Sequence, residues 1–407
     1  MSLYDGRPQN GKMLWTLVGQ LFGNTSGQEF GVSVSLNEVG DILSVGSVND
    51  NAALSTNYGS ICVYQIQERA PEDRSRGLTR KRLPSNSAKA SAAVVPHEMS
   101  SNYGVQQVGQ TLKQNVSSDG NYYGLSLSLS NSGNVLAVGA PNADNNSGRV
   151  FAYAFDSETD QWNPISLSND TGDKDDNLGW SVAISGDGTV LAAGAPQHQG
   201  SAHGYVNVYH LTSDAGQLSN TISSSGSWTS SVSSVLLLDR FGFSVSLDDA
   251  GGILAIGSPN STVKNVAKSA GVAAVFVQDP STSQWSVMGG KVFEGEAGDE
   301  LGFAVSLSSS GTRIAVGAPH TNNSGAVLIY DFNNYSWQMS PPIEGNGTGS
   351  DLGYSVSLNS EGTEVAIGLP FLTGCQFSLD MQRRIDSVCN AGTSMIYEDP
   401  LHQDVNP

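Results

Sequence analysis

Six stretches of the chain begin with the same alternation of apolar and small residues. In FGFSVSL (residues 241–247) an apolar side chain occupies every second position, and glycine or serine fills the places between. A period of two is typical of a β-strand with two unlike faces. The other copies begin at Phe30, Tyr123, Leu178, Leu301 and Leu352. Copies that span almost the whole chain indicate a repeat architecture.

Each copy continues with a short glycine-containing segment and a second apolar run. DDAGG (residues 248–252) is one of these segments and predicts a tight hairpin, because glycine supplies the positive φ that such turns require. The run that follows it, ILAIGSP (residues 253–259), has one aliphatic face and one face of small residues. Such a strand suits a sheet that is packed on both faces.

Two more strands are predicted in each unit. The third follows the pattern Gly-x-Val-x-Val-Tyr, and its copies begin at Gly59, Gly148, Gly204, Gly271, Gly325 and Gly392. The fourth carries an aromatic residue near its start, namely Trp15, Tyr103, Trp162, Trp228, Trp285 or Trp337. Five of the six tryptophans of the chain therefore occupy one position of the repeat.

Units of four antiparallel strands predict an all-β fold, a β-propeller with six blades. The chain begins with a strand of the fourth type and stops after a strand of the third type. We therefore expect the N-terminal strand to complete the last blade and to close the ring within a single domain, residues 1–407. Seven blades are the alternative.

Charge and hydropathy exclude some partners. The chain has 38 acidic and 19 basic residues and a formal net charge of −19. Phosphate binding needs a basic surface, so nucleic acid is not an expected partner. No run reaches the roughly eighteen apolar residues of a membrane helix, so direct membrane insertion is not expected either. The first residues, MSLYDGRPQN, show no apolar signal core.

The phrases FG-x-SVSL and LAVGAP resemble the FG-GAP repeat of integrin α-subunits and related surface proteins. The resemblance covers residues 15–397 and implies an extracellular propeller that serves adhesion or ligand binding rather than catalysis. Some integrin repeats also hold calcium between the FG and GAP strands. Here those hairpins, such as SGDGT (residues 185–189), are too short and too poor in carboxylates to supply the six or more oxygen ligands that calcium prefers.

The longer loops are expected on the opposite face, where binding residues concentrate. Acidic residues cluster in three of these loops, and the candidate ligand-binding residues are Asp170, Asp173, Asp175, Asp176, Glu296, Asp299, Glu300 and Asp351. They predict a calcium site or a contact surface for a basic partner. Hydrated turn residues are the alternative. No other cofactor is expected.

Candidate catalytic chemistry is sparse. His198, His203 and His320 occupy loops of the same predicted face, where they either contribute to a zinc site or are solvated. We find no nucleophile–histidine–acid constellation, phosphate-binding glycine loop or HExxH motif. The sequence therefore predicts no enzyme.

Two insertions interrupt the repeat. Residues 66–102 are rich in charge and proline and predict a mobile loop in the first blade. Residues 371–391 form an insertion in the last blade, where Cys375 and Cys389 either form a disulfide or remain reduced. Cys62 lies in a strand-like run and is expected in the core. The candidate glycosylation sites are Asn24, Asn115, Asn145, Asn169, Asn260, Asn322, Asn334 and Asn346.

We therefore expect a non-catalytic, extracellular binding or adhesion propeller that recognises a protein or glycan through its long-loop face. The alternative is a scaffold module in a larger cell-surface or matrix assembly, and an enzyme-attached propeller is a third reading. The expected location is outside the cell or at its surface, as a segment of a longer secreted precursor. An intracellular location is the alternative.

Overall fold

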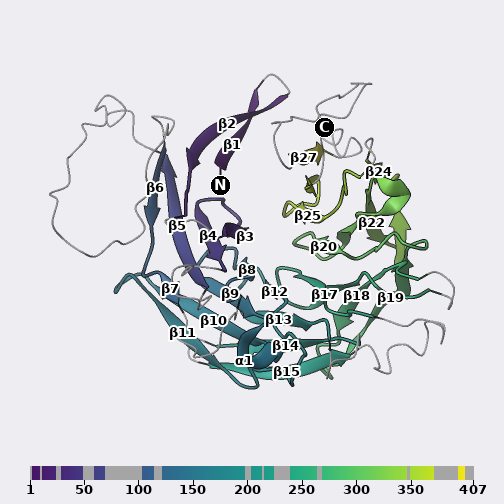
Figure 1. The fold of residues 1–407 in the computed structure, drawn as a ribbon, viewed down its shortest axis with the longest axis horizontal. Coiled ribbons are helices and arrows are strands. Elements are labelled where there is room, and N and C mark those ends of the chain that lie inside the picture. Colours follow the sequence, from purple (N-terminus) through teal and green to yellow (C-terminus); the bar gives the residue numbers. More distant parts are fainter. Residues whose placement is uncertain are drawn as a thin grey trace.

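The chain folds into antiparallel β-sheets arranged around a common centre (Figure 1). The computed structural model describes residues 2–9, 12–23, 29–48, 59–68, 103–113, 122–197, 203–212, 215–223, 239–263, 268–345, 349–370 and 393–398. No helix in these segments is long and apolar enough to span a membrane. Trp228, the two predicted insertions beyond Glu68 and both cysteines of the second one lie outside the described residues.

Each copy of the repeat forms one array of strands, which we call a blade. Blade 1 holds β3 (Phe30–Leu36), β4 (Ile42–Ser47), β5 (Ser60–Glu68), β6 (Tyr103–Gln107) and β7 (Leu112–Lys113). Blade 2 holds β8 (Ser126–Leu129), β9 (Val135–Ala140), β10 (Arg149–Asp156) and β11 (Gln161–Leu167), with the short α1 (Ala143–Asn146) between β9 and β10. Blade 3 holds β12 (Ser181–Ile184), β13 (Val190–Ala195), β14 (Tyr205–Leu211) and β15 (Ala215–Ser223).

The remaining blades repeat this order. Blade 4 holds β16 (Ser244–Leu247), β17 (Ile253–Ser258), β18 (Val272–Gln278) and β19 (Trp285–Glu294). Blade 5 holds β20 (Ala304–Leu307), β21 (Arg313–Ala318), β22 (Ala326–Asn333), β23 (Ser336–Met339) and β24 (Ile343–Glu344), with a 3-10 turn at Thr321–Asn323. Blade 6 holds β25 (Ser355–Leu358), β26 (Glu364–Leu369) and β27 (Thr393–Glu398). The first strand of each blade lies innermost (Figure 1).

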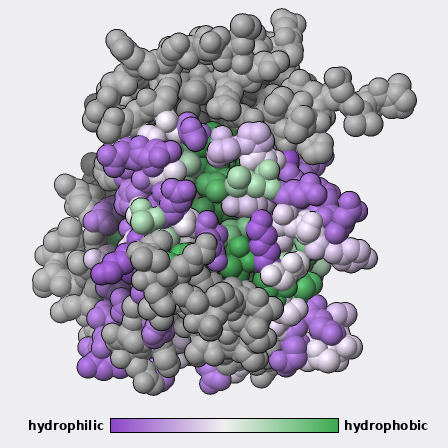
Figure 2. Space-filling model, turned by 90° about the vertical axis from the view of Figure 1, so that its right-hand side faces the viewer, coloured by the Kyte–Doolittle hydropathy of each residue, from purple (hydrophilic) through white to green (hydrophobic). Residues whose placement is uncertain are grey.

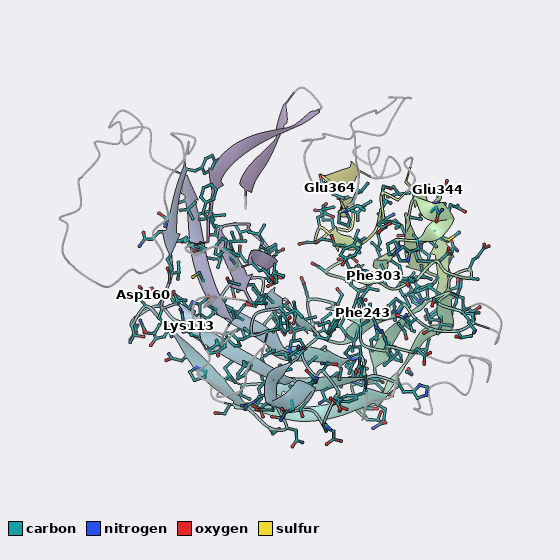
Figure 3. All side chains as sticks on the ribbon, viewed as in Figure 1. Lys113, Asp160, Phe243, Phe303, Glu344 and Glu364 are labelled. Atoms are coloured by element: carbon teal, nitrogen blue, oxygen red, sulfur yellow. The ribbon has the colours of Figure 1, made fainter. Side chains whose placement is uncertain are left out.

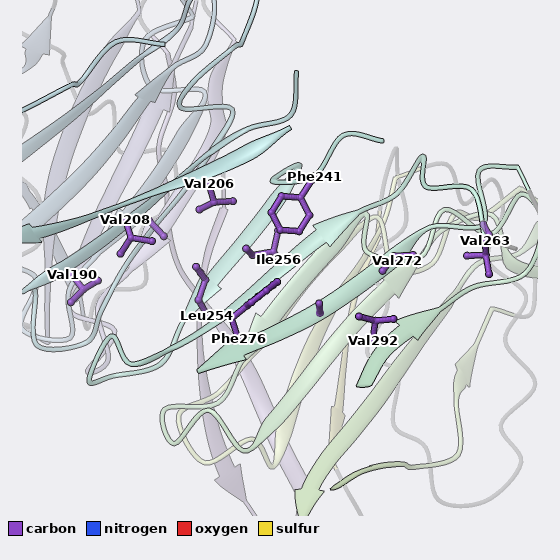
Figure 4. Packing of buried hydrophobic residues seen from close by; sticks show 13 residues of the cluster. Val190, Val206, Val208, Phe241, Leu254, Ile256, Val263, Val272, Phe276 and Val292 are labelled. Atoms are coloured by element: carbon purple, nitrogen blue, oxygen red, sulfur yellow. The ribbon is translucent and has the colours of Figure 1, made fainter. Parts of the chain in front are cut away.

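The hydrophobic core lies between the blades, because each blade buries one face against its neighbour. In one cluster Val206 and Val208 of β14 pack with Leu254 and Phe276 of blade 4 (Figure 4). Strands β11 and β15 also pair in parallel over two residues, which joins blades 2 and 3 at their outer edges. Seen from the side of β22 and β24, the described residues show hydrophilic side chains toward both sides of the view and hydrophobic ones between them (Figure 2).

A glycine contact recurs where neighbouring blades meet, and it explains the glycine in the second strand of the repeat. A Cβ on Gly257 would collide with the carbonyl oxygen of Gly302, the glycine at the start of the next blade. The same collision would occur at four other seams, formed by Gly46 with Gly124, Gly139 with Gly179, Gly194 with Gly242, and Gly317 with Gly353. Only glycine permits this approach.

The serines of the first strand bridge the same seams. Ser244 Oγ donates to the carbonyl of Gly302 at 2.9 Å, and Ser246 Oγ accepts from the backbone N–H of Leu307 at 3.0 Å. Ser33, Ser126 and Ser181 repeat the first bond, and Ser35, Ser128 and Ser306 repeat the second. The alternation read from the sequence therefore separates apolar side chains that pack against one blade from serines that bond the next.

The tight hairpins form a further set of links. Backbone hydrogen bonds join the hairpins of successive blades at Glu38–Asn131, Asn131–Gly186, Asp187–Asp249, Asp249–Ser309 and Ser309–Ser360. Between the last hairpin and the first, the contact is a side-chain one, from Ser360 Oγ to Glu38 Oε1 at 3.5 Å.

The seam between blades 6 and 1 is looser than the other five. The three atoms nearest to a Cβ on Gly368 all belong to Ser355 of its own blade, whereas at the other seams a carbonyl of the next blade lies closest. Val34 and Leu36 of β3 are 51 and 53 per cent exposed, whereas their counterparts Val305 and Leu307 are buried against blade 4. Blade 1 therefore leaves an apolar strip uncovered on the side of this seam.

The predicted all-β propeller-like fold is confirmed, but the predicted closure is not seen in the described residues. There β1 (Ser2–Gln9) pairs with β2 (Lys12–Gln20) as a separate two-stranded sheet, and β27 pairs with β26. A local hairpin explains the difference, since β2 finds its backbone partners in the strand directly before it. The total of six blades stays a prediction.

The glycine contact is tested by replacing Gly257 with alanine. The new Cβ forces the backbones of two blades apart, so we expect the free energy of unfolding to fall by about 1–3 kcal/mol or more. The matched control is Gly252→Ala, whose Cβ would meet nothing within 4 Å. We expect it to change stability by less than about 0.5 kcal/mol. Equal urea denaturation midpoints for the two variants would show that the contact does not limit the packing of the blades.

Candidate functional site

Each blade begins with the same turn on the face that carries the longer loops. The residue before the repeat has a positive φ in every copy: Glu29 50°, Tyr122 50°, Asn177 57°, Arg240 60°, Glu300 56° and Asp351 52°. Its carbonyl accepts from the backbone N–H three residues later, as from Phe303 to Glu300 at 3.2 Å. We call these six positions the turn residues. The turn fixes where the residue after the FG glycine lies.

That residue is aromatic in four consecutive blades. Trp180, Phe243, Phe303 and Tyr354 directly precede β12, β16, β20 and β25, and we call them the aromatic arc. Phe243 and Phe303 lie toward the centre of the ring of blades (Figure 3). In blades 1 and 2 the same position holds Val32 and Leu125. All six positions at the centre are therefore apolar.

The rings of the arc contact one another in sequence. The centroids of Trp180 and Phe243 are 5.5 Å apart, those of Phe243 and Phe303 5.0 Å, and those of Phe303 and Tyr354 4.7 Å. Neighbouring rings are tilted by 42 to 55°. Separations of this kind are favourable for aromatic pairs. The first three side chains are half-buried and Tyr354 is 45 per cent exposed, so the arc offers an apolar surface to solvent.

The acidic loop at residues 170–176 does not converge on one point. Asp170 pairs with Arg149 at 2.6 Å, and Asp175 lies 3.9 Å from the ammonium of Lys174. Asp176 is fully buried, and its Oδ2 accepts from the backbone N–H of Asp173 at 3.0 Å and from the Tyr205 hydroxyl at 2.8 Å. Burial, followed by the bond to this carboxylate, raises the pKa of Tyr205 well above its ordinary value. The carboxylates of Asp170 and Asp176 therefore stabilise the loop itself.

The second acidic loop is built in the same way. Asp299 Oδ2 accepts from the backbone N–H of Glu296 at 2.9 Å, as Asp176 does from Asp173. The structure brings Glu300 and Asp351 together through His320, whose Nδ1 lies 3.4 Å from Glu300 Oε2 and whose Nε2 lies 3.9 Å from Asp351 Oδ2. The two carboxylates face opposite sides of one imidazole, so they do not form a common coordination site with it.

Metal ligation finds no support in the part of the chain that the structure describes. No group of three or more histidine, cysteine, aspartate or glutamate side chains there is placed to hold an ion. In the SGDGT hairpin, Asp187 accepts from the Ser185 hydroxyl at 2.6 Å and from the Thr189 N–H at 2.9 Å. His203 lies 3.7 Å from Asp239, and His198 is outside the described residues.

The modification candidates divide by position. Asn145, Asn169, Asn322 and Asn334 are exposed and Asn260 is partly buried, while Asn24, Asn115 and Asn346 are outside the described residues. Cys62 is a buried free thiol, as predicted, and its Sγ lies 3.6 Å from the Thr111 hydroxyl. The pair Cys375 and Cys389 stays a prediction.

Sequence reasoning missed the aromatic arc. The four residues lie 51 to 63 positions apart in the chain, so they never form a visible cluster. The available signal was the variable letter in FG-x-SVSL, which reads Val, Leu, Trp, Phe, Phe and Tyr across the six copies. A variable position that stays apolar at the start of every innermost strand marks the centre of a propeller.

Comparison with known proteins supports the fold. No family model matches the sequence, and no curated protein sequence matches it. Sqt1 of Chaetomium thermophilum, solved bound to the N-terminus of a ribosomal protein, is similar with a TM-score of 0.50 and 16% identity, over 98% of this chain and 78% of Sqt1. A proposed 6-phosphogluconolactonase of Bacteroides uniformis is similar with a TM-score of 0.47 and 12% identity, over 81% of this chain and 76% of its own. The periplasmic gluconolactonase of Pseudomonas aeruginosa gives 0.45 and 12%, over 85% of this chain and 82% of its own.

These findings correct three expectations. The FG-GAP, integrin-like assignment is wrong, because no family model matches and the similar structures are propellers of other kinds. The predicted non-catalytic adhesion function is also wrong on this comparison, and so is the exclusion of enzymes, since two of these structures are named lactonases. The short repeat phrase misled the sequence reading because it records the packing of a blade, which unrelated functions share.

The buried carboxylate of Asp176 gives a test of the acidic loop. Replacing Tyr205 with phenylalanine removes a hydrogen bond to a charged, fully buried group, so we expect the free energy of unfolding to fall by about 1.5–3 kcal/mol. Tyr335→Phe is the matched control, since Tyr335 is 90 per cent exposed. Chemical denaturation measures both. A Tyr205→Phe variant as stable as the control would mean that the loop does not depend on this bond.

Proposed function

We propose that this propeller binds an extended segment of a partner protein across the aromatic arc. The observation that carries the proposal is the unbroken contact of four half-buried or exposed aromatic rings at the centre of the ring of blades. Aromatic side chains dominate the energetics of protein interfaces, because they bury large apolar areas at little entropic cost. An apolar surface of this kind, set among polar loops, is typical of an interaction site.

The dimensions of the arc fit a peptide. An extended chain advances about 3.3–3.4 Å per residue, so the successive ring separations of the arc match about four or five residues. The solved complex of Sqt1 with the N-terminus of a ribosomal protein supports the idea that a ring of this fold accepts such a segment. The acidic candidates Asp170, Asp173, Asp175 and Asp176 have no part in this proposal, since Asp170 is paired with Arg149 and the buried Asp176 accepts from Tyr205 and from the backbone of Asp173.

The test begins with peptides selected from a displayed random library on the wild-type protein. Their affinity for Phe243→Ala and Phe303→Ala is then measured by fluorescence anisotropy. Loss of one central aromatic contact should weaken binding about tenfold or more. Tyr335→Ala is the control, because it removes an exposed aromatic ring in the turn between β22 and β23 and should leave affinity unchanged. Selected peptides that bind both arc variants as tightly as the wild type would refute the arc as the site.

We also propose that the ring is closed by six blades, with the edge of β2 that does not pair with β1 joining β27, so that β2 is the fourth strand of blade 6. Three observations support this closure: blade 6 has three strands in the described residues, β27 is an edge strand, and Val34 and Leu36 are uncovered at the adjoining seam. An edge strand and an apolar strip are both stabilised by a partner.

Deleting residues 1–20 tests this closure. If β2 completes blade 6, its removal exposes a sheet edge and apolar area, and the free energy of unfolding should fall by several kcal/mol, on the order of 25 cal/mol per Å² newly exposed. The melting temperature of the truncated chain, compared with that of the full chain, gives the result. An unchanged melting temperature would mean that the hairpin β1–β2 contributes nothing to the ring.

A further inference from the structure

Charge is distributed unevenly around the aromatic arc. The six turn residues are Glu29, Tyr122, Asn177, Arg240, Glu300 and Asp351, each three positions before the apolar residue at the centre. The three carboxylates belong to blades 5, 6 and 1, which follow one another around the ring. The one cation belongs to blade 4. The turn residues of one half of the ring are therefore acidic, in a chain with a formal net charge of −19.

Arg240 shows that a side chain at the turn position reaches the arc. Its guanidinium carbon lies 5.9 Å from the centroid of the Phe243 ring, within the range of a cation–π interaction. The rings of the arc thus already receive a positive charge from the protein itself. Glu300 and Asp351 occupy the equivalent position relative to Phe303 and Tyr354, with a negative charge in place of the guanidinium.

The two carboxylates are partly buried and held in place. Their side chains are 22 and 18 per cent exposed, and His320 lies between them at 3.4 and 3.9 Å. A carboxylate whose position is fixed by its neighbours loses little entropy when a ligand binds. Phe303 and Tyr354 each follow one of these acids by three residues and are joined to it by the backbone bond of the turn, and their ring centroids lie 4.7 Å apart. Aromatic faces together with carboxylates attract a cation and repel an anion.

We propose that the Phe303–Tyr354 end of the arc, with Glu300 and Asp351, binds a lysine or arginine side chain of the partner segment. This inference rests on the proposed function and specifies the chemistry of the partner: a basic peptide segment. The stem of a lysine or arginine packs on the rings, and its charged head lies toward the carboxylates. Blade 4 does not favour such a side chain, because the guanidinium carbon of Arg240 lies 5.9 Å from the Phe243 centroid and repels a second cation.

The probes are three fluorescein-labelled heptapeptides of glycine and serine whose three central residues are lysine, leucine or glutamate. Binding to the full chain is followed by anisotropy at low and high salt. We expect the lysine peptide to bind at least tenfold more tightly than the glutamate peptide, with an advantage that shrinks as salt rises.

Two variants separate the ring contribution from the charge contribution. Phe303→Leu keeps apolar area but removes the aromatic face, and should weaken the lysine peptide about three- to tenfold while leaving the leucine peptide within about twofold. Glu300→Gln should weaken only the lysine peptide and reduce its salt dependence. Glu158→Gln, an exposed carboxylate in the turn between β10 and β11, is the control for the loss of one charge. Thermal melts confirm that each variant is folded.

The outcomes distinguish this inference from the proposed function. If the leucine peptide binds as tightly as the lysine peptide and Phe303→Ala weakens both, the arc is a binding site but the basic partner is wrong. If Glu158→Gln weakens the lysine peptide as much as Glu300→Gln does, the attraction is general and the assigned subsite is wrong. If the peptides selected on the wild type bind the arc variants as tightly as they bind the wild type, both proposals fail.

Discussion

The structure depends on the close approach of backbone between neighbouring blades. At five seams a glycine of the second strand lies against the carbonyl of the glycine that opens the next blade, where no Cβ fits. The serine of the first strand donates to that same carbonyl at four of these seams. This bond satisfies an acceptor that the packing buries. In blade 5 the position is Ala304, so the seam to Gly353 has the glycine contact without this serine bond. The glycine contact is therefore the more general constraint.

This constraint also places the candidate site. The glycine that opens each blade is fixed by the seam, and the residue after it must lie at the centre of the ring. The turn residue before it is fixed as well, since its carbonyl accepts from the N–H of that central residue. Function can therefore vary at two positions per blade without disturbing the packing. Aromatic residues at one position and charges at the other are sufficient to give the centre its own chemistry.

The sequence predicted the strands because their signals are local. The alternating stretch, the apolar run after the hairpin glycine and the Gly-x-Val-x-Val-Tyr run each correspond to a strand that the structure contains, such as β16, β17 and β18. The fourth strand of blade 3 was misplaced: β15 ends at Ser223, before the tryptophan at position 228 that the pattern selected. The aromatic arc was not predicted, because its residues become neighbours only when the blades are arranged around their common centre. The acidic loops were selected by composition, yet Asp176 and Asp299 serve their own turns, a role that composition does not reveal.

The most direct test of the account is to map where a bound peptide touches the protein. Benzoylphenylalanine replaces Phe303 in one variant and Tyr335 in another, and each is irradiated with a peptide selected on the wild type. We expect a covalent adduct at position 303, identified by mass spectrometry, and none above background at position 335. Equal labelling at the two positions, or labelling at position 335 alone, would contradict the claim that the aromatic arc is the binding site.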